Sequence, residues 1–189
     1  MNLRISVFCP LSLGLIIVLE GGLTFCLMLA AVMLHEFGHY FFIKLCGARI
    51  KRIDIEPLGA LIVYADGDTG LNEDIAIAAG GVIFNISAAI AGIVLFAFFY
   101  ELHLFIFIAT NLALAFVNLL PVSNLDGGRM LMAILLKKCD IVKAERTSSR
   151  VSVAGKVLLL IISALLVVAS GYNTALIILF LLNIIQINN

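Results

Sequence analysis

The sequence predicts an all-α polytopic membrane protein with about six transmembrane helices and a small membrane-associated β-hairpin after the second span. Two observations support this: the composition is too apolar for water, and long apolar stretches recur along the chain. Of the 189 residues, 63% are hydrophobic and 13% charged, and the mean hydropathy is +1.18. A soluble domain is nearer half apolar and a quarter charged, and one of this size could not bury so much apolar surface. Lipid is therefore the expected solvent.

The apolar stretches differ in length, which decides how easily each crosses a bilayer. The second and third are long enough to span as helices. The first and last are near the lower limit and need a thinned bilayer. The six stretches are residues 5–19, 22–46, 75–100, 102–121, 151–170 and 172–187.

Residues 48–65, between the second and third stretches, have a different pattern. Polar and apolar residues alternate from Ile50 to Ile55, and Pro57 and Gly59 then interrupt the run. Alternation followed by these residues predicts strand, turn and strand. We expect one intramembrane domain over residues 1–189, with this β-hairpin as an insertion and no appended soluble domain.

Basic residues predict the topology of the chain. The short connections near 101–103 and 171–173 contain no Lys or Arg, whereas the connections after the second and fourth spans are rich in both. The positive-inside rule places the basic connections in the cytoplasm. Six spans then put both termini in the cytoplasm of a multi-pass, bacterial cell-membrane protein. The net charge is zero and no basic face is apparent, so a nucleic-acid partner is not expected.

The second span contains the motif His35-Glu36-Phe37-Gly38-His39. Two histidines four residues apart lie on one face of a helix and can bind a single zinc ion. Glu36, beside them, is placed to accept a proton from a water molecule, as in zinc hydrolases. Three ionisable residues in an apolar helix are costly and usually functional, so a purely structural polar cluster is the weaker interpretation.

A catalytic zinc site needs a third protein ligand. His103 lies at the opposite end of the third span, at the wrong depth. Asp126 follows the fourth span at a depth that matches the histidines, in a segment where Pro121 ends the helix and Gly127-Gly128 permits sharp turns. The alternative is that Asp126 merely caps a helix that begins at Gly127. Spacing alone leaves both interpretations open.

These motifs resemble the site-2 protease family of intramembrane zinc metalloproteases. The resemblance rests on His35-Glu36-Phe37-Gly38-His39 together with Leu125-Asp126-Gly127-Gly128, and it covers about residues 20–135. The sequence is most similar to the sporulation branch, which processes a sigma-factor precursor. Shared features are Ile50-Lys51-Arg52, Pro57-Leu58-Gly59 and the run from Phe116 to Pro121. Ala60 and Val82 depart from common family residues, which affects expected substrate docking rather than chemistry.

The resemblance implies roles for individual residues. His35, His39 and Asp126 would bind one zinc ion, and Glu36 would act as general base. An extended substrate would add to the strand segment, edge to edge. The residues expected to bind substrate are Pro57, Gly59, Asn85 and Asn118.

The expected function is regulated intramembrane proteolysis of a membrane-associated protein near the cytoplasmic face. A membrane-tethered sigma-factor precursor is the substrate that the sporulation resemblance suggests. The branch often carries a cytoplasmic nucleotide-binding domain after the last span, which is not expected here, so that regulation would be either absent or supplied by another protein, such as a regulatory membrane partner. The alternatives are a membrane zinc carrier or sensor without proteolysis, and an inactive relative that only binds membrane proteins.

Overall fold

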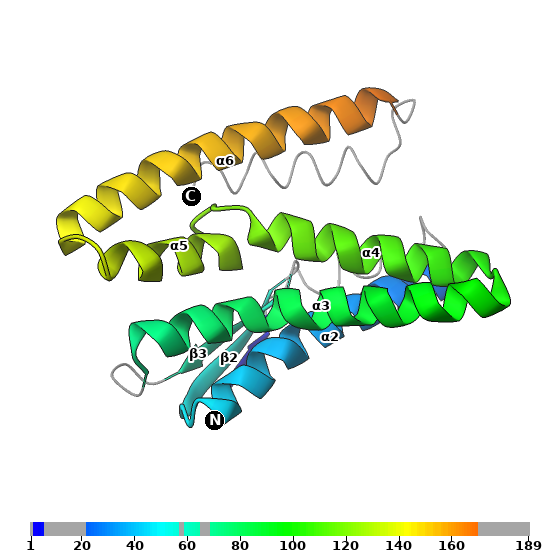
Figure 1. The fold of residues 1–189 in the computed structure, drawn as a ribbon, viewed down its shortest axis with the longest axis horizontal. Coiled ribbons are helices and arrows are strands. Elements are labelled where there is room, and N and C mark those ends of the chain that lie inside the picture. The colour runs from blue at the N-terminus through cyan, green and yellow to red at the C-terminus, as the bar shows by residue number, and fades with distance from the viewer. Residues whose placement is uncertain (1, 6–21, 57–58, 65–68, 170–189) are drawn as a thin grey trace.

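The computed structural model describes residues 2–5, 22–56, 59–64 and 69–169, and these are mostly helical. Figure 1 shows the long helices lying roughly side by side, with α4 and α5 along one line. In chain order the elements are β1 (Asn2–Ile5), α2 (Gly22–Leu45), β2 (Ile50–Glu56), β3 (Gly59–Tyr64), α3 (Leu71–Phe99), α4 (Leu102–Leu119), α5 (Asp126–Leu136) and α6 (Ile141–Ala169).

Four of the described helices, namely α2, α3, α4 and α6, are long and apolar enough to cross a membrane. They correspond to the second to fifth predicted spans. Helix α6 begins ten residues before the predicted stretch 151–170 because a polar first part, from Ile141 to Arg150, continues the same helix. The predicted spans at 5–19 and 172–187 lie almost entirely outside the described residues, so a total of six stays a prediction.

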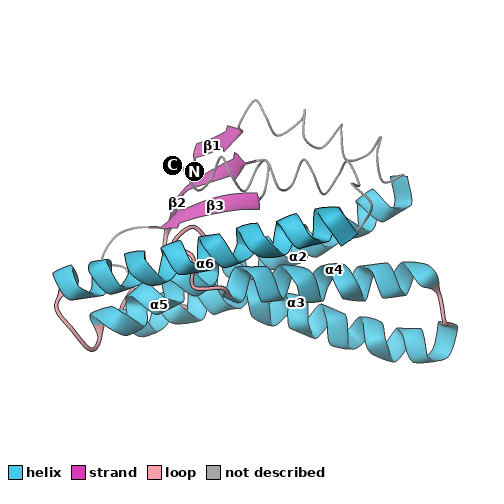
Figure 2. Cartoon of the chain, turned by 90° about the horizontal axis from the view of Figure 1, so that it is seen from above, coloured by secondary structure: helices cyan, strands magenta, loops and turns pink. Residues whose placement is uncertain are grey.

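The strands form a three-stranded sheet in the order β1-β2-β3. Strands β2 and β3 pair antiparallel, from Ile50 opposite Tyr64 to Glu56 opposite Gly59, where strand, turn and strand were expected. The sequence did not predict β1, which pairs parallel to β2. Figure 2 shows the sheet on one side of the helices with β3 nearest to them, and β3 packs against α2. Association of the sheet with the membrane stays a prediction.

Helices α2 and α3 cross at a pair of glycines. A Cβ atom on Gly38 would overlap the carbonyl oxygen of Gly80, and one on Gly80 would lie 2.7 Å from the oxygen of Gly38. Small residues of this kind allow helix backbones in a membrane to approach closely. Since Gly38 lies between His35 and His39, the closest approach of α3 occurs beside the two histidines.

The break between α4 and α5 is held in part by a hydrogen bond to α6. Helix α4 ends at Leu119, as Pro121 predicted, and α5 begins at Asp126. The backbone N–H of Ser123 donates to Oγ of Ser152 on α6 at 2.9 Å. Irregular backbone among membrane helices needs such internal partners. The break therefore lets α5 pack against α3, and α6 satisfies part of the backbone of the connection.

The Gly38–Gly80 contact generates a prediction about stability. Gly38→Ala should lower the free energy of unfolding by about 1–3 kcal/mol, because a methyl group cannot fit without separating α2 from α3. Gly22→Ala is the control, since a Cβ there meets nothing within 4 Å. Thermal unfolding of both variants in detergent measures the difference. Equal midpoints would show that the two backbones are not in contact.

Candidate metal centre

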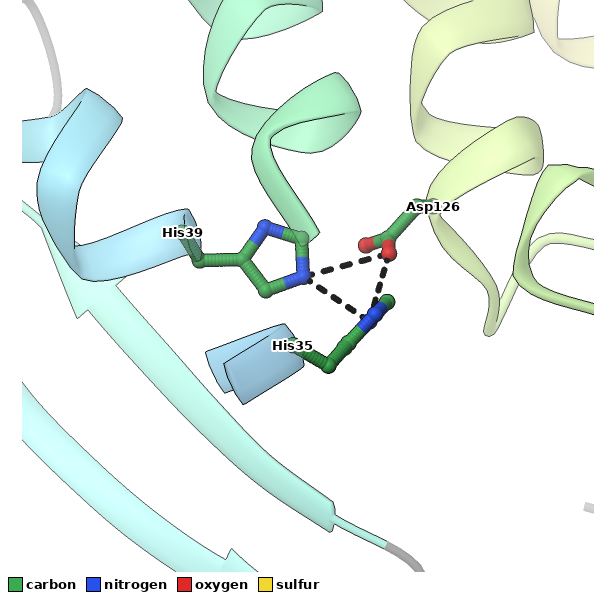
Figure 3. A group of neighbouring side chains, drawn as sticks. All are labelled: His35, His39 and Asp126. Atoms are coloured by element: carbon green, nitrogen blue, oxygen red, sulfur yellow. Dashed lines mark hydrogen bonds and ion pairs between the residues drawn. The ribbon is translucent and has the colours of Figure 1, made fainter. Parts of the chain in front are cut away.

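Three side chains converge between α2 and α5, as Figure 3 shows. The Nε2 atoms of His35 and His39 lie 3.1 Å apart. Oδ2 of Asp126 lies 3.0 Å from Nε2 of His35 and 3.1 Å from Nε2 of His39. All three residues are buried, with exposed fractions of 6%, 7% and 7%. Within the described part of the chain, these are the His, Cys, Asp or Glu side chains that could share one metal ion.

Regular helix geometry brings the two imidazoles together. His35 and His39 are one turn apart on α2, so their rings lie together on one face, edge to face, with centroids 4.7 Å apart and planes at 85°. The crossing at Gly38 holds this face against α3.

The position of Asp126 decides between the two interpretations of this residue. The capping residue of α5 is Leu125, no side-chain cap bond is formed, and Asp126 is the first residue of the helix. The capping alternative is therefore wrong. Gly127 and Gly128 are helical, as that alternative had it, and do not form a sharp turn. A Cβ on Gly127 would overlap the carbonyl oxygen of Leu119 at the end of α4, and one on Gly128 would overlap that of Val122 in the α4–α5 connection. They permit close approach of this connection rather than sharp turns.

Hydrogen bonds on the far side of each ring fix which nitrogen carries the proton. Nδ1 of His39 lies 2.8 Å from the carbonyl oxygen of Ile77, which can only accept, so Nδ1 is the donor. Nδ1 of His35 lies 2.6 Å from Oδ1 of Asn85, another acceptor. In the neutral rings both Nε2 atoms then carry lone pairs. These lone pairs face each other and Oδ2 of Asp126.

Electrostatics favour a cation among these atoms. Burial raises the pKa of Asp126, which lies outside the four candidate spans, but hydrogen bonds from the neighbouring imidazoles and attraction to them, when those rings are protonated, lower it to about 2. A metal ion in the place of those protons would favour the ionised carboxylate in the same way. Oδ2 of Asp126 is buried and forms no hydrogen bond beyond the two imidazole contacts. Three lone-pair atoms near 3 Å repel one another unless a positive charge lies between them.

The donor set fits zinc. Zinc takes His nitrogen and carboxylate oxygen at about 2.0–2.1 Å in a tetrahedral arrangement, which separates ligand atoms by about 3.3–3.4 Å. The observed separations of 3.0–3.1 Å are within a few tenths of an ångström of that. Two nitrogens and one oxygen leave the fourth position open, as in catalytic rather than structural zinc sites. Outer hydrogen bonds from both rings match the usual support of zinc-binding histidines.

Gly81 on α3 makes room for the two rings. A Cβ there would lie 2.5 Å from Cε1 of His35 and 2.6 Å from Nε2 of His39. Any larger residue would therefore occupy the space of the imidazoles. The Gly80-Gly81 pair thus serves two contacts, one with the α2 backbone and one with the metal-binding face.

The structure also describes most of the remaining predicted site residues. Glu36 follows His35 on α2 and is partly buried. Asn118 lies in the last turn of α4 and donates to the carbonyl oxygen of Leu114 at 3.0 Å. Gly59 begins β3, and Pro57 lies outside the described residues.

Two further residues that the sequence singled out, His103 and Asn85, can be placed as well. His103 is exposed near the start of α4 and is not in the metal-binding group, as expected. Asn85 was expected to bind substrate, but it is fully buried and its amide contacts His35 and neighbouring helices.

Sequence reasoning missed two residues of this site, Gly81 and Asn111. Asn111 is fully buried on α4 and accepts a hydrogen bond from Asn85. A signal was present, because an amide within an apolar span is costly and usually bonds across helices. For Gly81 no such signal was present, because one sequence does not show which helix packs against it.

Comparisons with known proteins agree with this geometry. The profile of peptidase family M50 matches residues 23–105 and 100–162. Stage IV sporulation protein FB of Bacillus subtilis is 32% identical over 130 residues, which are 67% of this chain and 45% of that protein. A zinc metalloprotease of Methanocaldococcus jannaschii is 31% identical over 143 residues, 72% of this chain and 40% of that protein. The chain thus spans less than half the length of these two curated relatives.

A solved structure shares the fold. The site-2 protease from Methanocaldococcus jannaschii superposes with a TM-score of 0.69 at 25% identity, covering 100% of this chain and 90% of that one. Together with the four apolar helices, this supports a multi-pass membrane protein. The resemblance seen in the motifs is confirmed: the chain belongs to peptidase family M50, the site-2 proteases.

Proposed function

We propose that the chain is a zinc-dependent endopeptidase that hydrolyses a peptide bond of a membrane-associated protein. The observation that carries this proposal is the group of three buried ligand atoms, 3.0–3.1 Å apart, provided by two membrane-helix histidines and a carboxylate. His35, His39 and Asp126 would hold one zinc ion. The family supports the same activity, since a relative is a zinc metalloprotease.

Glu36 is the proposed general base. Zinc, when bound, would supply Lewis-acid polarisation of the carbonyl and acidify water. Glu36 lies one residue from His35, about 100° round the helix, so its carboxylate is at the edge of the metal-binding face. It would accept the proton of the attacking water and pass it to the leaving amine. The Nδ1 bonds to Asn85 and Ile77 keep the imidazoles in one orientation meanwhile.

The proposed substrate is a membrane-associated protein cut near the cytoplasmic face, with a membrane-tethered sigma-factor precursor as the leading candidate. The similarity to a sporulation protein supports this choice. Basic residues support the orientation: Lys44, Arg49 and Lys51 follow the His-bearing part of α2. We further propose that the protein lies in a bacterial cell membrane with both termini in the cytoplasm, and that a regulatory membrane partner acts on it.

Strand β3 is the proposed docking edge for the substrate. It is one of the two edge strands of the described sheet, and it is the one that packs against α2, the helix that carries both histidines. An extended segment can add to such an edge through main-chain hydrogen bonds. Extension also exposes the scissile carbonyl, which a helix would keep hydrogen-bonded. Pro57, Gly59 and Asn118 remain the proposed substrate-contacting residues.

Glu36→Gln tests the proposed base. The variant should keep its zinc, because no ligand changes, and should lose at least about a hundredfold in cleavage rate. The assay is co-expression with tagged membrane-anchored proteins, including a sigma-factor precursor, followed by the size of each product. Cleavage at the wild-type rate would refute the role of Glu36. Zinc binding by the wild type without cleavage of any candidate would favour the carrier or sensor.

Gly81→Ala tests the metal role of the histidine face. The added methyl would displace the imidazoles, so zinc affinity should fall about tenfold or more. Gly92→Ala is a matched control on the same helix, since its Cβ would lie 2.7 Å from Cγ1 of Ile108, away from the site. Both variants should lose stability, but only Gly81→Ala should lose zinc in chelator competition. Equal zinc affinity in the two would contradict the assignment.

A further inference from the structure

We infer that Asn111 is a positioning residue for the metal site, which fixes the proton of His35 through Asn85. The inference rests on the proposed zinc role of His35. Asn111 does not itself contact the histidine. It lies on α4, whereas Asn85 is on α3 and His35 on α2, so one chain of hydrogen bonds runs through three helices.

The chain of hydrogen bonds begins at a backbone carbonyl, which can only accept. Nδ2 of Asn111 donates to the carbonyl oxygen of Phe107 at 2.9 Å. This fixes the amide orientation, so Oδ1 of Asn111 points away from its own helix as an acceptor. Nδ2 of Asn85 donates to that oxygen at 2.7 Å.

A second backbone group fixes the same orientation of Asn85. Its Nδ2 also donates to the carbonyl oxygen of Ala31 on α2 at 3.0 Å. With both N–H bonds used, Oδ1 of Asn85 is left to face Nδ1 of His35 at 2.6 Å. His35 must therefore donate from Nδ1, and the lone pair of a neutral ring lies on Nε2, the atom that faces His39 and Asp126.

The opposite orientation of the Asn85 amide would remove the metal-binding lone pair from Nε2 of His35. Its oxygen would then face two acceptors, Ala31 O and Asn111 Oδ1, while its N–H groups faced Nδ1 of His35. The proton of His35 would move to Nε2 and block the metal position. Asn85 and Asn111 are both 0% exposed, so water cannot replace a lost partner. Buried amides of this kind are costly unless every bond is formed, which makes the network selective for one arrangement.

Asn111→Leu is the direct test, made on the purified full chain in detergent. Zinc affinity from chelator competition should fall about tenfold or more, as for other outer partners of zinc-binding histidines. The visible spectrum of the cobalt(II)-substituted chain should change as well, because the ligand field at His35 changes. Asn111→Asp should restore affinity close to wild type, since a protonated carboxyl can accept from Asn85 and donate to Phe107 O.

Thr110→Val is the matched control on the same helix. Oγ1 of Thr110 donates to the carbonyl oxygen of Ile106 at 2.9 Å, so the variant loses one intrahelical bond without touching the network. Its zinc affinity should equal that of the wild type. If Asn111→Leu fails to fold, Asn111→Ser decides, because a serine hydroxyl can bond back to Phe107 O but is too short to reach Asn85. It should bind zinc as weakly as predicted for the leucine variant.

Two results would overturn the inference alone. One is wild-type zinc affinity and an unchanged cobalt spectrum in Asn111→Leu, or in Asn111→Ser if the former does not fold. The other is an Asn111→Asp variant that folds but binds zinc as weakly as Asn111→Leu. Failure of the wild-type chain to bind zinc would overturn the proposed function together with this inference, so the two failures are distinguishable.

Discussion

The mutual repulsion of three buried lone-pair atoms is the constraint on which the rest of the structure depends. Nε2 of His35, Nε2 of His39 and Oδ2 of Asp126 face one another at 3.0–3.1 Å, and the other sides of both rings are occupied by acceptors. Such a group is unfavourable in a protein interior without a cation.

Close packing of the surrounding helices holds these three atoms together. Glycines at positions 38, 80 and 81 let α3 lie directly on the histidine face of α2, and Gly127 and Gly128 let α5 pack on the preceding connection. Asn85 and Asn111 then orient His35 from α3 and α4. The glycines allow the helix backbones to approach closely, and the two amides set the orientation of the His35 ring. Neither kind of residue could replace the other in its role.

Sequence alone predicted the parts of this arrangement that depend on local spacing. His35 and His39 are one helical turn apart in any α-helix, and Pro121 ends α4 wherever that helix packs. The strand alternation from Ile50 to Ile55 also corresponds to β2. The rest depends on which helices meet. A single sequence could not show that Asn85 faces His35 rather than substrate, that Gly127 and Gly128 pack against the carbonyl groups of Leu119 and Val122, or that β1 joins the sheet, because these follow from tertiary contacts.

Metal content of the purified chain tests the central claim most directly. We expect one zinc ion per chain, lost in His35→Ala, His39→Ala and Asp126→Ala but kept in His103→Ala, whose histidine is exposed near the start of α4. Zinc that survives Asp126→Ala at full occupancy, or that disappears with His103→Ala, would contradict it.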